Sequence, residues 1–179
     1  MVSKYSGRCR CGNVTYTISG EPVWNMSCHC NWCQTTSGSA FRTFVLFKEK
    51  DLEISGDSFS SYEDTTTDHG RSMINQFCRN CGTQIGINVP NMDTRHISIG
   101  TLDQRRDIQI KDNIWWQEAL QFISFPVGSD VYKTGYWNGT GEKILKRRLL
   151  LWVVVNVVLV TLSVIAIIVI FRGSSSLIG

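Results

Sequence analysis

The chain has 179 residues, with 18 Lys and Arg against 15 Asp and Glu and a formal net charge of +3. Up to about Gly141 the charges nearly cancel, at 13 basic and 14 acidic residues, so this part has neither a basic patch for nucleic acid nor an acidic tail. The first residues carry no apolar export signal, which argues against an oxidising compartment. We therefore expect one domain with one core and no nucleic-acid partner.

Short alternating segments dominate the first 141 residues, and no long segment has the 3.6-residue period of an amphipathic helix. Alternation of apolar and polar side chains predicts strands with one buried face, and the Gly, Pro and Asp residues between them predict turns. The predicted strands, in chain order, are residues 14–18, 41–47, 58–62, 85–89 and 97–99. We therefore expect a mainly β domain of small antiparallel sheets, in which bound metal compensates for a thin core.

All seven cysteines fall in close-spaced clusters. Thiolates one or two residues apart can converge on one tetrahedral ion at Zn–S distances of about 2.3 Å. A structural zinc takes four protein ligands, whereas three ligands leave one position open for water or substrate. Seven thiols therefore predict two zinc ions per chain, one structural and one open. The clusters are Cys9 with Cys11, the triple of Cys28, Cys30 and Cys33, and Cys78 with Cys81.

The spacing leaves the grouping of these cysteines open. The middle cluster is the one local triple, so the two outlying pairs would have to meet across a sheet, but a crosswise pairing also fits the sequence. Three other uses of the thiols compete with zinc. A disulfide framework leaves one odd thiol, an iron–sulfur cluster takes similar ligands, and a redox pair needs a Cys-x-x-Cys that opens a helix within a βαβ unit. Zinc is the interpretation that we prefer.

The C-terminal segment has a different composition. Residues 149–171 are 23 residues without a charge, and a helix rising about 1.5 Å per residue over that length spans a hydrocarbon core of about 30 Å. Basic residues crowd the segment 142–148, whereas 172–179 contains one Arg, so the positive-inside rule places the N-terminal domain, residues 1–141, in the cytoplasm. We expect a single-pass, tail-anchored membrane protein with a basic linker, a transmembrane helix and a short polar tail. A cleaved lipid-anchor signal is the competing interpretation, but it requires an exported chain.

The residues that flank the cysteines form three ordered motifs. They read Gly7-x-Cys9-x-Cys11-Gly12-x-Val14-x-Tyr16, then Cys28-His29-Cys30-x-x-Cys33-Gln34 with Ser37-Gly38 and Phe41, then Phe77-Cys78-x-x-Cys81-Gly82-Thr83. This pattern, over about residues 5–135, resembles the glutathione-dependent formaldehyde-activating enzyme family, which also includes centromere protein V. Two departures stand out. Arg10 occupies a position where the family commonly has His, and family members are generally soluble single domains without an apolar tail.

The resemblance implies a β-tent fold that holds two zinc ions. It also implies an S-(hydroxymethyl)glutathione synthase, a carbon–sulfur lyase that joins glutathione to formaldehyde, with the glutathione sulfur at the open zinc. The alternative is a non-catalytic zinc module that binds glutathione or acts as a membrane-tethered scaffold. The implied ligands are Cys9, Cys11, Cys78 and Cys81 for the structural ion, and Cys28, Cys30 and Cys33 for the open, catalytic one.

Several other side chains have two interpretations each. Arg42 is a candidate for a glutathione carboxylate, since Arg suits bidentate recognition, or else an exposed strand charge. His29 is expected to point away from the ion, either as a structural histidine or as a support for a ligand. Trp32 and Gln34 flank the triple and either contact the tripeptide or pack. The remaining candidates are His69 in an expected solvated turn, His96 without a motif around it, and Trp115, Trp116 and Trp137, which cover a pocket or fill the core.

Overall fold

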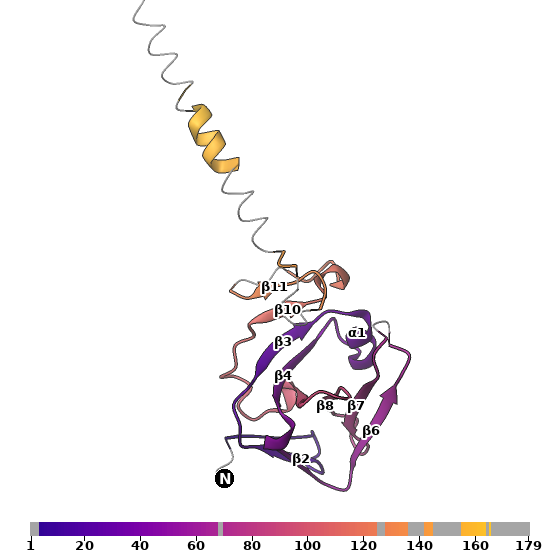
Figure 1. The fold of residues 1–179 in the computed structure, drawn as a ribbon. Helices are drawn as coiled ribbons and strands as arrows, with labels where there is room; N and C mark the ends of the chain where they lie inside the picture. The colour runs from indigo at the N-terminus through magenta and orange to yellow at the C-terminus, as the bar shows by residue number, and fades with distance from the viewer. Residues whose placement is uncertain are drawn as a thin grey trace, which may run out of the picture. The chain divides into compact units, whose positions relative to one another are not determined.

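The computed structural model describes residues 4–67, 70–124, 128–135, 142–144, 155–163 and 165. Contacts divide the chain into two units, Met1–Glu142 and Lys143–Gly179. The described part of the first unit is mainly β, as predicted, with two sheets and one short α-helix (Figure 1). The cysteine motifs all lie in this first unit.

The smaller sheet has three antiparallel strands in the order β1-β2-β5. In β2 the side chains alternate, with Thr15 and Thr17 exposed and Tyr16 and Ile18 buried. This is the pattern from which the strand was predicted, because successive side chains of a strand point to opposite faces. The strands are β1 (Tyr5–Arg8), β2 (Thr15–Ile18) and β5 (Leu52–Ser55).

The larger sheet has eight strands in the order β11-β10-β3-β4-β9-β8-β7-β6. It is larger than the small sheets that we expected, and it is not wholly antiparallel, because β10 pairs in parallel with both β3 and β11. The strands are β3 (Trp24–Cys28), β4 (Arg42–Lys48), β6 (Phe59–Asp64), β7 (Met73–Cys78), β8 (Gln84–Asn88), β9 (Thr94–Ser98), β10 (Asp112–Ile114) and β11 (Asp130–Val131).

The predicted strands correspond to β2, β4, β6, β8 and β9, with one clear boundary error. The strand predicted at 97–99 is the end of β9, which begins three residues earlier, at Thr94. Ile99 already belongs to a 3₁₀ turn. The sequence pattern missed β1, β3, β5, β7, β10 and β11, and the last two are too short to show alternation. The helical elements of this unit are α1 (Asn31–Ser37) and the 3₁₀ turns Glu49–Asp51, Ile99–Thr101 and Trp116–Glu118.

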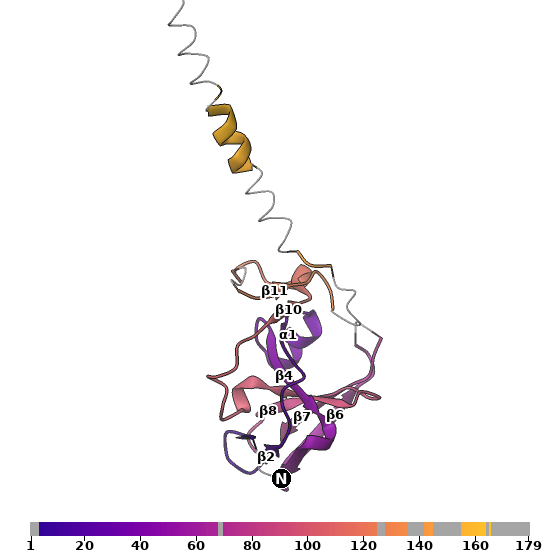
Figure 2. The same cartoon turned by 60° about the vertical axis from the view of Figure 1, so that its left-hand side comes forward.

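Strand β4 is buried on both faces and divides the core in two. Phe44 and Leu46 pack in one hydrophobic cluster, together with the cysteines of the triple. Val45 and Phe47 pack in the other, together with Cys9 and Cys78. Because alternate side chains of a strand point to opposite faces, the two cysteine groups lie on opposite faces of the larger sheet. In both views α1 lies at the opposite end of the unit from β2 (Figures 1 and 2).

The predicted transmembrane helix is wrong. Within 149–171 the structure describes 155–163 and 165, and these residues are helical. None of the helices that the described residues form is long and apolar enough to cross a membrane. The tail-anchored arrangement and the cytoplasmic placement, which followed from the spanning helix, are corrected with it.

The uncharged run was not sufficient evidence for a span, because hydropathy measures how apolar a segment is and does not by itself establish a long helix. Polar side chains of the described helix bond to its own backbone. Thr161 Oγ1 donates to the carbonyl oxygen of Val158 at 2.8 Å, and Ser163 Oγ donates to that of Leu159 at 2.8 Å. The other residues of the predicted span lie outside the described part of the chain.

The double burial of β4 leads to a stability prediction. Phe47 is fully buried, whereas Phe122 is 74% exposed. Phe47→Ala should lower the free energy of unfolding by about 3–5 kcal/mol, because it removes a buried ring and leaves a cavity. Phe122→Ala, the matched control, should change it by less than about 0.5 kcal/mol. Urea unfolding of the metal-loaded chain measures both, and similar losses would contradict the assignment of β4 as the central strand.

Candidate metal centres

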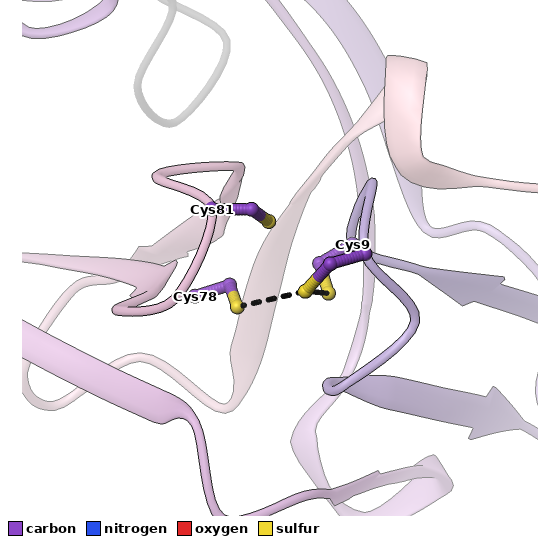
Figure 3. A group of neighbouring side chains, drawn as sticks. Cys9, Cys78 and Cys81 are labelled. Atoms are coloured by element: carbon purple, nitrogen blue, oxygen red, sulfur yellow. Dashed lines mark hydrogen bonds between the residues drawn. The ribbon is translucent and has the colours of Figure 1, made fainter.

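Two loops bring four cysteines together. Cys9 and Cys11 lie in the turn between β1 and β2, and Cys78 and Cys81 lie at the end of β7 and in the turn that follows it. Each turn closes on a backbone bond: Gly12 N donates to Cys9 O at 3.1 Å, and Gly82 N donates to Cys78 O at 2.8 Å. Figure 3 shows Cys78 and Cys81 facing Cys9 from the opposite loop.

The glycine that ends each turn is required by its backbone conformation. Gly12 has a φ of 81° and Gly82 a φ of 70°. Residues with a Cβ adopt this left-handed region at a cost of about 1–2 kcal/mol. The pairs Cys11-Gly12 and Cys81-Gly82 therefore each turn the chain sharply, and each turn leaves two thiols on the same side of its loop.

The spacing of the four sulfurs fits a tetrahedral ion. All four ligand atoms lie within 4.8 Å of one another. The Sγ atoms of Cys9 and Cys11 are 3.5 Å apart, and those of Cys11 and Cys78 are 3.7 Å apart. A tetrahedron with Zn–S bonds of about 2.3 Å has edges of about 3.8 Å. The structure thus brings the two outlying pairs together, the grouping that spacing alone could not choose.

Polar groups around these four sulfurs favour the thiolate form. Asn80 Nδ2 donates to Cys11 Sγ at 3.3 Å and is the main cause of the lowered pKa of Cys11. The side chain of Thr83, 3.1 Å from Cys81 Sγ, is the largest contribution to a Cys81 pKa lowered to about 5. Burial acts the other way on Cys78, whose pKa rises to about 11. Hydrogen bonds of this kind hold metal ligands in place and tune them.

The triple is built at the junction of a strand and a helix. Cys28 ends β3, Cys30 is the N-cap of α1, and Cys33 lies in the first turn of that helix. Cys30 Sγ accepts from Cys33 N at 3.4 Å, so a ligand sulfur also caps the helix. All three side chains are buried, and their sulfurs lie within 4.8 Å of one another. The sequence analysis treated them as one local group, and the structure brings them together.

Three buried thiols at this distance cannot all ionise without a nearby cation. Thiol–thiol hydrogen bonding is the largest cause of the raised pKa values of Cys28 and Cys33, and burial raises them further. A divalent ion at the centre of the group removes this penalty, because it attracts each thiolate. Both cysteine groups can therefore hold a metal ion, and soft thiolate donors in a tetrahedral arrangement suit zinc.

A buried arginine lies near the triple. Arg42 is only 5% exposed, so it is not an exposed strand charge. Its Nη1 donates to Asn75 Oδ1 at 2.8 Å, and its guanidinium lies 4.9 Å from the centre of the Phe44 ring. Burial lowers the Arg42 pKa, while the thiols, Cys33 first, act in the opposite direction. A zinc ion with three thiolates carries a formal charge near −1, which this guanidinium offsets.

A cavity of about 60 Å³ opens beside the triple. A cavity of about 150 Å³ can hold benzene, so this one admits a group of a few heavy atoms and is too small for a whole tripeptide. Its walls are mostly apolar, including Trp32, Phe44, Met73, Ile87 and Trp115. Trp115 has a φ of 58°, a left-handed conformation that is strained for a bulky residue and is found most often at functional sites.

Other candidates from the sequence have structural partners. His29 is buried and its Nε2 lies 3.2 Å from Asn113 Oδ1, while Trp116 packs edge-on at 4.8 Å between ring centres. Gln34 Nε2 donates to the carbonyl oxygens of His29, at 2.6 Å, and Glu118, at 2.9 Å.

Trp32 Nε1 donates to Asp64 Oδ2 at 2.8 Å, although the Trp32 ring also lines the cavity. His69 and Trp137 lie outside the described residues.

His96 is a candidate to which the sequence analysis gave no role. It lies on β9, is 3% exposed and lines the cavity beside the triple. No local motif surrounds it, because its position depends on the pairing of β9 with β4 and β8. The alternation of Ile97 and Ile99 in the sequence predicts that His96 points to the opposite face of the strand from them. It gives no indication that a cavity lies on that face.

Comparison with known proteins identifies the family. The sequence profile described as glutathione-dependent formaldehyde-activating enzyme matches residues 4–118, which include all seven cysteines. Comparison with curated protein sequences gave no significant match. One solved structure, described as the crystal structure of a Rhodobacter sphaeroides protein, aligns with a TM-score of 0.46 and 18% identity, over 59% of this chain and 96% of that chain.

The geometry predicts unequal roles for the two cysteine groups. The four-cysteine group joins residues about 70 positions apart, and a cross-link over such a loop is worth about 4 kcal/mol by chain entropy. The triple spans six residues and closes no long loop. Cys78→Ser should therefore unfold the first unit or lower its melting temperature strongly, whereas Cys33→Ser should leave it folded with one bound metal ion fewer.

Thermal unfolding and metal content per chain measure these effects. Equal losses of melting temperature in the two variants would contradict the division into a structural and an open centre.

Proposed function

The chain belongs to the glutathione-dependent formaldehyde-activating enzyme family, and we propose that it joins glutathione and formaldehyde to give S-hydroxymethylglutathione. The observation that carries this proposal is the buried triple of Cys28, Cys30 and Cys33 beside a cavity too small for anything but a small molecule. The family relationship supports a function connected with glutathione and formaldehyde. That the chain catalyses formation of the carbon–sulfur bond is our further proposal.

We propose that each cysteine group holds one zinc ion. Cys9, Cys11, Cys78 and Cys81 would complete a four-ligand sphere, and such closed spheres are structural. A zinc ion held by the triple would keep one position open, and it would lower the pKa of a thiol bound there. Glutathione supplies the thiol that suits such a position.

The residues around the triple contribute placement and charge. The guanidinium of Arg42 balances the excess negative charge of the thiolates, because it is buried close to them. The apolar cavity walls exclude water and so favour formaldehyde itself over its hydrate. Holding the carbonyl carbon next to the glutathione sulfur converts a reaction of two solutes into one within a single complex.

The reaction balances without an external reductant or oxidant. The thiol proton of glutathione leaves on ionisation, and the sulfur forms a bond with the carbonyl carbon. The π electrons of the carbonyl group move to its oxygen, which takes up a proton. The sum is one thiol plus one aldehyde giving one S-hydroxymethyl thioether, and the reverse direction releases formaldehyde.

Thiols add to formaldehyde unaided, so binding and catalysis need separate measurements. Calorimetry should detect glutathione binding to the metal-loaded wild-type chain, and Cys33→Ser should abolish it. S-methylglutathione, which cannot form a thiolate, should compete poorly. In a cobalt-substituted chain, glutathione should change the visible absorption, because the sulfur enters the coordination sphere.

Exchange spectroscopy by NMR then measures the rate between formaldehyde and its glutathione adduct. We expect the wild-type chain to accelerate this exchange at least tenfold over buffer. Binding without acceleration would show that the chain is a glutathione carrier and not an enzyme. Unchanged visible absorption of the cobalt-substituted chain would overturn coordination of the metal by the glutathione sulfur.

A further inference from the structure

One residue that lines the cavity beside the triple has a buried side-chain nitrogen without a hydrogen-bond partner. Among the described residues that line it, His96 alone has a buried side-chain nitrogen, Nδ1, without a partner. Leaving a buried polar group unpaired costs about 1–3 kcal/mol. A native chain tolerates such a cost most readily where a ligand supplies the partner.

The strand register fixes the side of the sheet on which His96 lies. His96 pairs with Leu46 of β4 and with Ile87 of β8. Both partners belong to the hydrophobic cluster that contains the triple, and directly paired side chains share one face of a sheet. Ile97, the next residue, belongs to the cluster on the other face. The imidazole therefore faces the same space as the three thiols.

The surroundings keep this imidazole neutral. Burial, followed by the charges of Arg42 and Arg95, lowers the His96 pKa to about 4. The ring of Phe44 packs edge-on against it, at 5.7 Å between ring centres. A neutral imidazole offers one N–H donor and one acceptor nitrogen, and a donor is the group that a carbonyl oxygen requires.

We propose that this cavity is the binding site for the aldehyde and that His96 holds the aldehyde oxygen by a hydrogen bond. The inference rests on the proposed function and names the second substrate's position and size. The cavity takes a neutral carbonyl compound of about two or three heavy atoms, with one polar atom directed to His96 and its carbon toward the triple. Glutathione, which is far larger, contributes only its sulfur end at the rim.

The experiment separates the aldehyde from glutathione. His96→Leu removes the hydrogen-bonding group and keeps an apolar side chain of similar size. We expect it to raise the KM for formaldehyde about tenfold, while the Kd for glutathione changes by less than twofold. His96→Gln keeps a donor and should recover most of the loss. A general packing defect would weaken both ligands together.

Thr94→Val is the matched control. Thr94 lies on the same strand, is buried, and also has an unpartnered side-chain oxygen, but it does not line the cavity. This variant should leave both constants unchanged. A formaldehyde KM that is unchanged in His96→Leu, or equally raised in Thr94→Val, would overturn the role of His96.

The wild-type chain provides a measurement that does not depend on how the variants fold. The ¹⁵N signals of the His96 ring should shift when formaldehyde is added to the glutathione-loaded chain, and they should not shift with glutathione alone. Unshifted signals would overturn the inference while the proposed function stands. A wild-type chain that binds no glutathione would instead overturn the proposed function, and this inference with it.

Discussion

The burial of β4 on both faces is the constraint on which the rest of this structure depends. A strand with alternate side chains in two separate cores must be covered on each side, and each cover carries one cysteine group. The loops of β1–β2 and β7–β8 supply four thiols on one face. The junction of β3 and α1 supplies three on the other. Because the sheet lies between them, a closed centre and an open one can coexist without exchanging ligands.

The sequence predicted what is local and missed what depends on pairing. The Cys28 triple follows from spacing within a few residues, and alternation located five of the eleven strands of the described residues. The meeting of Cys11 with Cys78 needed the sheet topology, as did the burial of Arg42. Arg42 lies two residues before the apolar run 44–47, so its burial had a weak signal in the sequence. The uncharged tail gave a strong signal that the described helix does not support.

Charge connects the residues of the open centre. Three thiolates and one divalent ion leave an excess of one negative charge, and the buried Arg42 supplies the opposite sign close by. Burial lowers the pKa of His96, and the same guanidinium, with Arg95, lowers it further and so favours a neutral ring. A cationic imidazole beside the thiols would compete with the metal ion for them, whereas a neutral one can bond to an uncharged substrate. The positive charge of Arg42 therefore has two effects: it offsets the charge of the thiolates, and it lowers the pKa of His96 beside the cavity.

The small size of the cavity implies that the two proposed substrates are recognised in different parts of the site. In the site that we propose, a cavity of about 60 Å³ would select the aldehyde by volume and by one hydrogen bond, and it is too small for a whole peptide. On the proposed function, the thiol would be recognised at the rim, where its sulfur bonds to the carbon of the aldehyde. A larger aldehyde is excluded by the packed walls of Phe44, Ile87 and Trp115, because a close-packed core yields little without strain. On the proposed function, specificity for a small carbonyl compound would follow from the packing around β4, and specificity for a thiol would follow from the open position of a metal ion held by the three cysteines.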